Sequence, residues 1–203
     1  ADLEFLRDKK PYNNLTTIGT WVASLGYKGV QIPTWDPRVF DLDKAAQSRG
    51  YCRDIKGKLK SLGLQVTELA SHLQGQVMAI HPAYEAAFRG FYPEGLDDKG
   101  RVAWATDQLK KTVLASKNMG LKSVPVLSGG LAWHMLYPWP QRPQGLVDEA
   151  FKELYRRWRP VLNLARDNGV TIAYELHPGS DIYDGATFEL FLKKARNHPA
   201  ACL

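Results

Sequence analysis

The sequence predicts an α/β fold with a parallel sheet, of the (β/α)8 or TIM-barrel type, with about half of the barrel in this chain. Three observations predict it: a repeated helix–glycine–strand pattern, apolar strands too far apart for hairpins, and polar residues at the carboxyl ends of those strands. Residues 1–203 are expected to form a single, partial domain of this kind.

The repeated pattern consists of an amphipathic helix, a glycine, and a short β-branched run that ends in polar side chains. It occurs at residues 24–35, 61–72, 118–129 and 167–178, with glycines at Gly26, Gly63, Gly120 and Gly169. A glycine in this place ends a helix, because it adopts the left-handed conformation without a Cβ clash. Pro160 lies inside the apolar stripe of the helix before the fourth glycine, and we expect it to kink or divide that helix.

The expected strands cover residues 30–32, 66–69, 124–127 and 170–174, and residues 201–203 have the composition of the opening of a fifth. Helical segments separate these strands, so they need crossover connections and the sheet is expected to be parallel. Their largely apolar composition suits strands that are buried on both faces.

Polar residues gather where each expected strand ends, and this decides between a barrel and a doubly wound sheet. A barrel brings the carboxyl ends of all its strands to one mouth, whereas a doubly wound sheet uses only the loops at its switch point. No dinucleotide fingerprint or phosphate-binding loop follows any strand, so the barrel is favoured. Because a complete barrel takes about 250 residues, a partner copy or a longer natural protein is expected to cover the open edges.

Composition and charge are those of a globular domain without a membrane segment. No apolar run approaches the roughly 18 residues of a spanning helix, and the charged N-terminal segment lacks the apolar centre of a signal peptide. The net charge of +6 comes from basic residues beside apolar helix positions, which predicts a solvated helix surface rather than a nucleic-acid site. Cys52 and Cys202 have no metal-ligand or disulfide spacing, and we expect reduced thiols in a cytoplasmic protein.

Glu175 is the leading candidate for a catalytic residue. It directly follows a buried strand, where a carboxylate can bind a divalent cation, act as a base, or do both. His177 lies two residues further on, and both side chains would face the same side if the strand continues that far. The alternatives are a salt-bridged or capping glutamate and a histidine that is hydrogen-bonded within the loop.

Two further candidates come from the strand at 66–69 and the loop after it. His72 could donate to a substrate hydroxyl or act as an acid or base near neutral pH. Glu68 is expected either to join the site or to be an interior carboxylate that pairs with a neighbour. His81, further along this loop, could line the mouth of the barrel, but a structural role is favoured.

The segment 133–143 forms the most unusual expected loop, rich in aromatic residues and proline. Trp133 and Trp139 are predicted substrate contacts, because aromatic rings stack on the apolar faces of sugars. Arg142 could pair with a phosphate or carboxylate of the substrate. A rigid loop whose aromatic residues pack over the barrel is the alternative, and both can hold together.

Several of these segments together resemble a known family. The segments are GYKGVQIPTWD, TELASHLQGQ, HPAYEAAF, LYPWPQRP and AYELHPGSDIYDGATFE. They resemble bacterial sugar phosphate isomerase/epimerase-like proteins of the xylose-isomerase-like TIM-barrel superfamily, in order and over nearly the whole chain. The resemblance implies that the visible strands are the second to fifth of the barrel.

The same resemblance implies a metal-dependent enzyme that acts on a sugar or sugar phosphate. Such enzymes hold one divalent ion, Mn²⁺, Mg²⁺ or Zn²⁺, and Glu175 matches the first of the ligands. The other ligands would come from strands six to eight, outside this segment. The metal would stabilise an enediolate formed by proton abstraction next to a carbonyl. Glu175 would be a ligand and potential base, and His72 and His177 would contact substrate oxygens.

Three other functions remain open from the residues. A dehydratase of cyclic polyols or keto acids would use the same fold and metal. A partial barrel without catalytic activity could bind a sugar or a partner chain, including a second copy of itself. A DNA-repair endonuclease of the same superfamily is disfavoured, because too few His, Asp and Glu residues lie at the visible strand ends.

Overall fold

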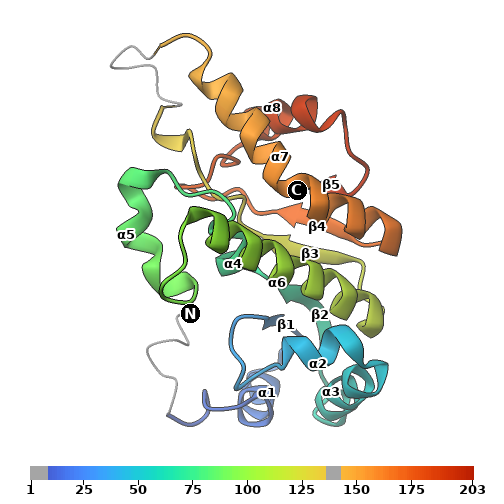
Figure 1. Cartoon of the computed structure of the whole chain (residues 1–203). Coiled ribbons are helices and arrows are strands. Elements are labelled where there is room, and N and C mark those ends of the chain that lie inside the picture. Colours follow the sequence, from blue (N-terminus) through green and yellow to red (C-terminus); the bar gives the residue numbers. More distant parts are fainter. Residues whose placement is uncertain (1–8, 136–142) are drawn as a thin grey trace.

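The computed structural model describes residues 9–135 and 143–203 of the chain (Figure 1). The strands are β1 (Gly29–Pro33), β2 (Gln65–Ala70), β3 (Ser123–Val126), β4 (Thr171–Tyr174) and β5 (Ala201–Cys202). The helices are α1 (Leu15–Ser24), α2 (Leu42–Gln47), α3 (Arg49–Ser61), α4 (His72–Gln76), α5 (Glu85–Phe88), α6 (Asp98–Met119), α7 (Leu146–Asn168) and α8 (Gly185–Ala195). Three short 3-10 turns complete the described elements: η2 (Pro82–Tyr84), η3 (Arg89–Phe91) and η4 (Trp133–Met135).

All the strand pairs are parallel, which confirms the predicted α/β fold. Strand β1 pairs with β2, and β3, β4 and β5 pair in that order. The two sheets meet where the Ser71 amide donates to the Pro125 carbonyl oxygen at 2.9 Å. Each strand follows a helix and lies next to the preceding strand, as in the wall of a partial barrel (Figure 1).

The glycines end their helices as predicted. Gly120 and Gly169 follow α6 and α7 with φ of 74° and 66°, and both lie in the left-handed region. Of the two expectations for Pro160, division of the helix is wrong, because α7 continues without interruption from Leu146 to Asn168, and a kink stays a prediction. Trp158, Val161 and Leu162 are fully buried around this proline, and their packing holds the helix on the sheet.

One face of the sheet carries the main core. The side chains of Val124, Val126, Ile172 and Tyr174 are buried there, together with Trp158 of α7. Tyr174 makes an edge-to-face contact with Trp158, with the ring centroids 5.0 Å apart. Because these positions alternate along β3 and β4, the residues between them face the other side of the sheet.

Polar groups occupy that other face. The two oxygens of Glu68 accept hydrogen bonds from Gln31 Nε2 at 3.0 Å and from Ser123 Oγ at 2.9 Å. Glu68 therefore links β1, β2 and β3, which confirms the interpretation of Glu68 as an interior carboxylate paired with its neighbours. Both cysteines are free thiols, with Cys52 buried and Cys202 partly exposed. Among the helices of the described residues, none has both the length and the apolar character needed to cross a bilayer.

Candidate functional site

The ends of β2 and β4 bring together the two strongest candidates from the sequence. His72 starts α4 almost directly after β2, and Glu175 follows the last residue of β4. The Glu175 amide donates to the Val126 carbonyl oxygen at 2.9 Å, which extends the pairing of β3 and β4 by one residue. His72 Nε2 and Glu175 Oε2 lie 3.1 Å apart, with the histidine 20% and the glutamate 52% exposed.

The surroundings of His72 favour the neutral form of its imidazole. Burial lowers the pKa of His72 from its ordinary value of 6.5, and this effect outweighs the opposing charge of Glu175. The charge of His177 adds to the lowering of the His72 pKa. Although it is close to Glu175, Nε2 lacks the alignment of a hydrogen bond and has no such partner among the described residues. The site therefore contains an exposed carboxylate beside a neutral, unpartnered ring nitrogen.

His177 lies beyond the end of β4, so the condition under which it would face the same side as Glu175 is not met. Strand β4 ends at Tyr174, and His177 Nδ1 lies 2.6 Å from the Pro178 carbonyl oxygen. The side chain is exposed. Its proposed contact with substrate stays a prediction.

Trp133 lies in an aromatic cluster after β3. Its ring packs against Tyr84 with a centroid distance of 5.1 Å, and the rings of His81 and His134 are 4.3 Å apart in the same cluster. His81 Nδ1 accepts a hydrogen bond from the Ala83 amide at the start of η2, as expected of a structural histidine. This packing fits the alternative of a loop with structurally packed aromatic residues, and a substrate role for Trp133 stays a prediction. The other two predicted substrate contacts, Trp139 and Arg142, lie outside the described residues.

Asp181 is a structural residue near the site that the sequence analysis missed. Its carboxylate is fully buried and accepts hydrogen bonds from the Leu131 and Ala132 amides, each at 2.8 Å. Burial raises the pKa of Asp181, although these amides act in the opposite direction. Asp181 thus fixes the loop after β4 to the loop that leads into Trp133. A buried carboxylate of this kind has no local sequence pattern that would identify it.

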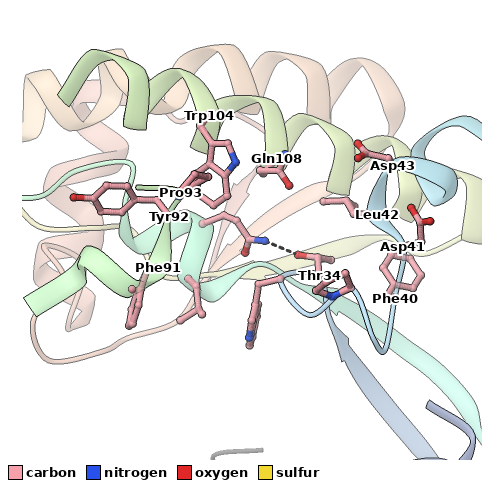
Figure 2. A pocket seen from close by; sticks show the side chains of 15 residues that line it. Thr34, Phe40, Asp41, Leu42, Asp43, Phe91, Tyr92, Pro93, Trp104 and Gln108 are labelled. Carbon is pink, nitrogen blue, oxygen red and sulfur yellow. Dashed lines mark hydrogen bonds between the residues drawn. The ribbon is translucent and has the colours of Figure 1, made fainter. Parts of the chain in front are cut away.

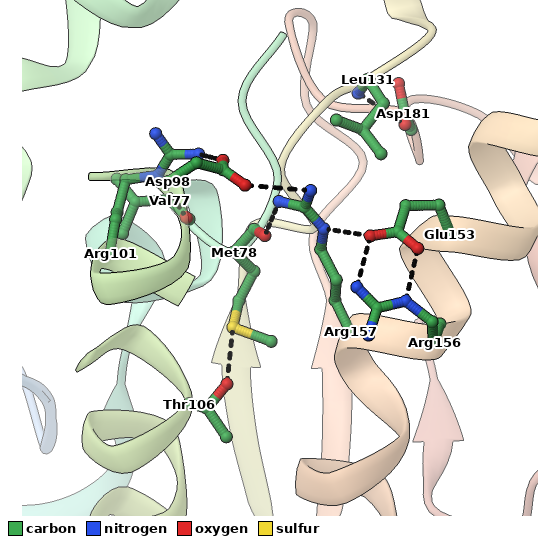
Figure 3. A network of polar contacts seen from close by, with 10 residues as sticks. All are labelled: Val77, Met78, Asp98, Arg101, Thr106, Leu131, Glu153, Arg156, Arg157 and Asp181. Atoms are coloured by element: carbon green, nitrogen blue, oxygen red, sulfur yellow. Dashed lines mark hydrogen bonds and ion pairs between the residues drawn. The ribbon is translucent and has the colours of Figure 1, made fainter. Parts of the chain in front are cut away.

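A polar network supports the segment after α4 (Figure 3). Arg101 Nε donates to the Val77 carbonyl oxygen, and Arg157 donates to the Met78 carbonyl oxygen at 3.0 Å. Asp98 forms an ion pair with each arginine, and Glu153 holds the other side of Arg157. The expectation of a solvated basic surface is therefore wrong for Arg157, whose side chain is only 11% exposed. Two cations meet the carbonyl end of α4, which is where a helix favours positive charge.

Replacing Glu153 with glutamine is expected to lower the free energy of unfolding by about 1 kcal/mol at pH 7. Hydrogen bonds from Arg156 and Arg157 lower the pKa of Glu153 from 4.5 to about 2. The expected loss of unfolding free energy is smaller than this pKa shift alone would give, because the Glu153 side chain is one-third exposed and solvent screens its ion pairs. A depressed carboxylate pKa stabilises the fold above pH 4.5, and this contribution is lost as the pH falls toward 2.

Urea unfolding of the wild type and of Glu153→Gln at several pH values checks this expectation. The difference between wild type and Glu153→Gln should be constant above about pH 5 and should shrink progressively below it. Glu149→Gln, in the same helix and exposed, is the matched control and should change little at any pH. A difference between wild type and Glu153→Gln that grows at low pH would contradict the assignment.

The site supplies two of the donors that a divalent metal ion needs, but not a complete set of ligands. Glu175 supplies carboxylate oxygens, and His72 supplies a neutral ring nitrogen without a partner, both of which suit Mn²⁺ or Zn²⁺. In the part of the chain that the structure describes, no group of three or more His, Cys, Asp or Glu side chains could hold a metal ion. Residues outside the described ones would therefore have to supply the remaining ligands.

Comparison with known proteins shows the family to which the chain belongs. The family model described as "Xylose isomerase-like TIM barrel" matches residues 20–201. The chain belongs to the xylose isomerase-like TIM barrel family. No curated protein matches the sequence.

Solved structures of similar fold include three bacterial proteins. A xylose isomerase domain protein from Planctomyces limnophilus is 16% identical, with a TM-score of 0.52, and the match covers 89% of this chain and 54% of that one. A xylose isomerase-like TIM barrel protein from Mycobacterium smegmatis in complex with magnesium is 15% identical, with a TM-score of 0.55 and coverage of 92% and 54%. The 3-keto-D-glucoside 4-epimerase of E. coli is 14% identical, with a TM-score of 0.59 and coverage of 93% and 61%. The chain therefore spans between half and two thirds of the length of these members of the fold.

Proposed function

We propose that this chain forms part of the active site of a sugar isomerase or epimerase. The observation that carries the proposal is the contact between Glu175 and a neutral, unpartnered His72 at the carboxyl edge of parallel strands. In barrels of this type the active site lies at that edge. The magnesium complex and the 3-keto-D-glucoside epimerase among the similar structures support the same class of function.

In the proposed reaction, Glu175 removes the proton next to the carbonyl group of a sugar or sugar phosphate. The C–H bond breaks, the proton moves to the carboxylate, and the electron pair passes to the carbonyl oxygen. His72 Nε2 hydrogen-bonds an adjacent substrate oxygen, and His177 and Trp133 contact the rest of the sugar. Epimerisation is completed when a second acid, from outside the described residues, donates a proton to the other face and Glu175 gives its proton to solvent. Isomerisation is completed when Glu175 returns its proton to the neighbouring carbon while the hydroxyl proton moves from one substrate oxygen to the other.

A divalent ion would use Glu175 as one ligand and take most of its other ligands from outside residues 1–203. When bound, such an ion supplies positive charge that stabilises the enediolate oxygens. A second copy of the chain, or further residues, would close the open side of the barrel. We expect the whole protein to be active only when the barrel is closed in this way.

The test is exchange of the substrate proton with solvent deuterium, followed by NMR on a panel of aldoses and ketoses with added Mn²⁺. Replacing Glu175 with glutamine is expected to reduce the exchange rate at least about 100-fold, because general-base catalysis contributes that much. Binding of Mn²⁺, measured by calorimetry, is expected to weaken in the same variant. Glu189→Gln, an exposed glutamate on α8, is the control and should change neither quantity.

Unchanged exchange together with unchanged Mn²⁺ affinity in Glu175→Gln would refute the proposal. A product that absorbs in the ultraviolet would instead indicate loss of water, since dehydration next to a carbonyl gives a conjugated product. That result would assign the dehydratase reaction to the same residues.

A further inference from the structure

A pocket of about 490 Å³ lies between α6 and the segments around Thr34 and Phe91 (Figure 2). Its walls come from the segment after β1, from α4, from the segment around η3, and from α6. The lining residues are Thr34, Trp35, Pro37, Phe40, Asp41, Leu42, Asp43, Leu73, Gln74, Gly90, Phe91, Tyr92, Pro93, Trp104 and Gln108. The volume is in the range of small-molecule sites.

Trp35 connects this pocket to the proposed active site. Its ring lines the pocket and lies 6.0 Å from the ring of His72, centroid to centroid. Leu73 and Gln74, which directly follow His72 in α4, also line the pocket. Neither His72 nor Glu175 is among the lining residues, so the pocket and the proposed active site are neighbours that meet at Trp35.

Gln74 presents an unsatisfied amide in the wall of the pocket. The residue is 1% exposed, and its Nε2 donates to Thr34 Oγ1 at 3.3 Å. Gln74 Oε1 has no hydrogen-bond partner among the described residues. Exchanging the two ends of the amide leaves the other atom unpaired, so one polar atom stays unsatisfied in either orientation.

Thr34, which accepts the hydrogen bond from Gln74, belongs to a buried chain of hydroxyl groups. Thr34 Oγ1 also bonds the Ala70 carbonyl oxygen at 3.0 Å and Ser71 Oγ at 2.6 Å. Ser71 Oγ in turn bonds Thr112 Oγ1 at 2.8 Å. A buried polar atom without a partner is costly, and a ligand hydroxyl can satisfy either end of the amide because it both donates and accepts.

Flat aromatic rings form much of the remaining wall. Figure 2 shows Trp104 of α6 and Tyr92 of the opposite segment beside the pocket. Trp35, Phe40 and Phe91 also line the pocket. Rings of this kind bind the apolar C–H faces of a sugar, while hydroxyl groups at the sugar's edge reach polar atoms such as those of Gln74.

The charge of the lining disfavours an anionic ligand. None of the lining residues is Lys, Arg or His, whereas Asp41 and Asp43 are both present. Their counterions are Lys44 for Asp41 and Lys111 for Asp43, so the two lysines are already engaged. A phosphate group placed here would meet two carboxylates without a free cation, whereas a neutral ligand would not incur this cost.

We propose that this pocket binds a neutral carbohydrate ring. A hydroxyl group of the ring pairs with the Gln74 amide, and the ring stacks on Trp104. The proposal does not depend on the reaction at Glu175, since neither Glu175 nor His72 lines the pocket.

The test uses methyl β-D-glucopyranoside as a neutral probe and glucose 6-phosphate as an anionic one, with affinities for the 1–203 chain measured by NMR titration. Trp104→Ala and Gln74→Met are each expected to weaken binding of the neutral probe about tenfold, through lost stacking and a lost hydrogen bond. Glucose 6-phosphate should bind at least about tenfold more weakly than the neutral probe. Trp21→Ala, outside this pocket, and Glu175→Gln are the controls and should leave the affinity unchanged.

Circular dichroism and thermal unfolding check that each variant is folded, and Trp104→Leu replaces Trp104→Ala if the latter is not. The proposal is overturned if the neutral probe does not bind, if Trp21→Ala weakens binding as much as Trp104→Ala, or if the phosphate binds more tightly. The proposal is also overturned if Glu175→Gln loses binding of the neutral probe while Trp104→Ala and Gln74→Met keep it, because the sugar would then bind at the neighbouring His72–Glu175 site. That last result would leave the proposed function intact, so the two failures are distinguishable.

Discussion

Replacing Trp158 with alanine is expected to lower the free energy of unfolding by about 4 kcal/mol, the cost typical of removing a large buried aromatic side chain. The side chain is fully buried between α7 and the sheet. Its Nε1 donates to the Ser128 carbonyl oxygen at 2.9 Å, and its ring contacts Tyr174 edge to face. The variant therefore loses apolar burial, an aromatic contact and a buried hydrogen bond together. Urea unfolding followed by circular dichroism measures the change.

Two variants calibrate this result. Trp158→Phe keeps most of the apolar contact and should cost about 1 to 2 kcal/mol, chiefly because the Ser128 carbonyl loses its donor. Trp21→Ala, at a residue that is 36% exposed, should cost about 1 kcal/mol or less. Equal losses in Trp158→Ala and Trp21→Ala would show that α7 does not pack on the sheet as described.

The order and direction of the strands could be predicted from the sequence because local chemistry determines them. Gly120 and Gly169 end their helices by adopting a conformation that few other residues reach, and an apolar run follows each. Pro160 shows the limit of this reasoning. A local rule predicts a break at that proline, but the buried residues around it keep the helix continuous.

The sequence predicts which residues of the candidate site follow a strand, but not the contacts that they make with distant segments. Glu175 and His72 were predicted because each follows a strand, but their contact spans β3, which lies between β2 and β4. Arg157 has the local pattern of a solvated helix residue, and its role follows from contacts with the Met78 carbonyl, after α4, and with Asp98. The unpaired amide of Gln74 likewise depends on the neighbours that surround it in three dimensions.

Asp181 is the clearest case of a residue whose role depends on distant segments, and Asp181→Ala is expected to cost about 4 kcal/mol of unfolding free energy. The variant leaves the Leu131 and Ala132 amides without acceptors, and each unsatisfied buried donor costs about 1 to 3 kcal/mol. Urea unfolding measures the total. Hydrogen exchange at these two amides measures the local effect, and both should exchange faster in the variant.

The conservative variant and a surface control separate this effect from general damage. Asp181→Asn keeps one acceptor oxygen and should cost about half as much, whereas Asp167→Ala, at an exposed aspartate at the end of α7, should stay within about 0.5 kcal/mol of wild type. Because Asp181 also fixes the loop leading into Trp133, fluorescence of the Trp133 region should change in Asp181→Ala but not in Asp167→Ala. Unchanged exchange at Leu131 and Ala132 would show that the carboxylate does not hold this loop, and the link between the loops after β3 and β4 would then need another explanation.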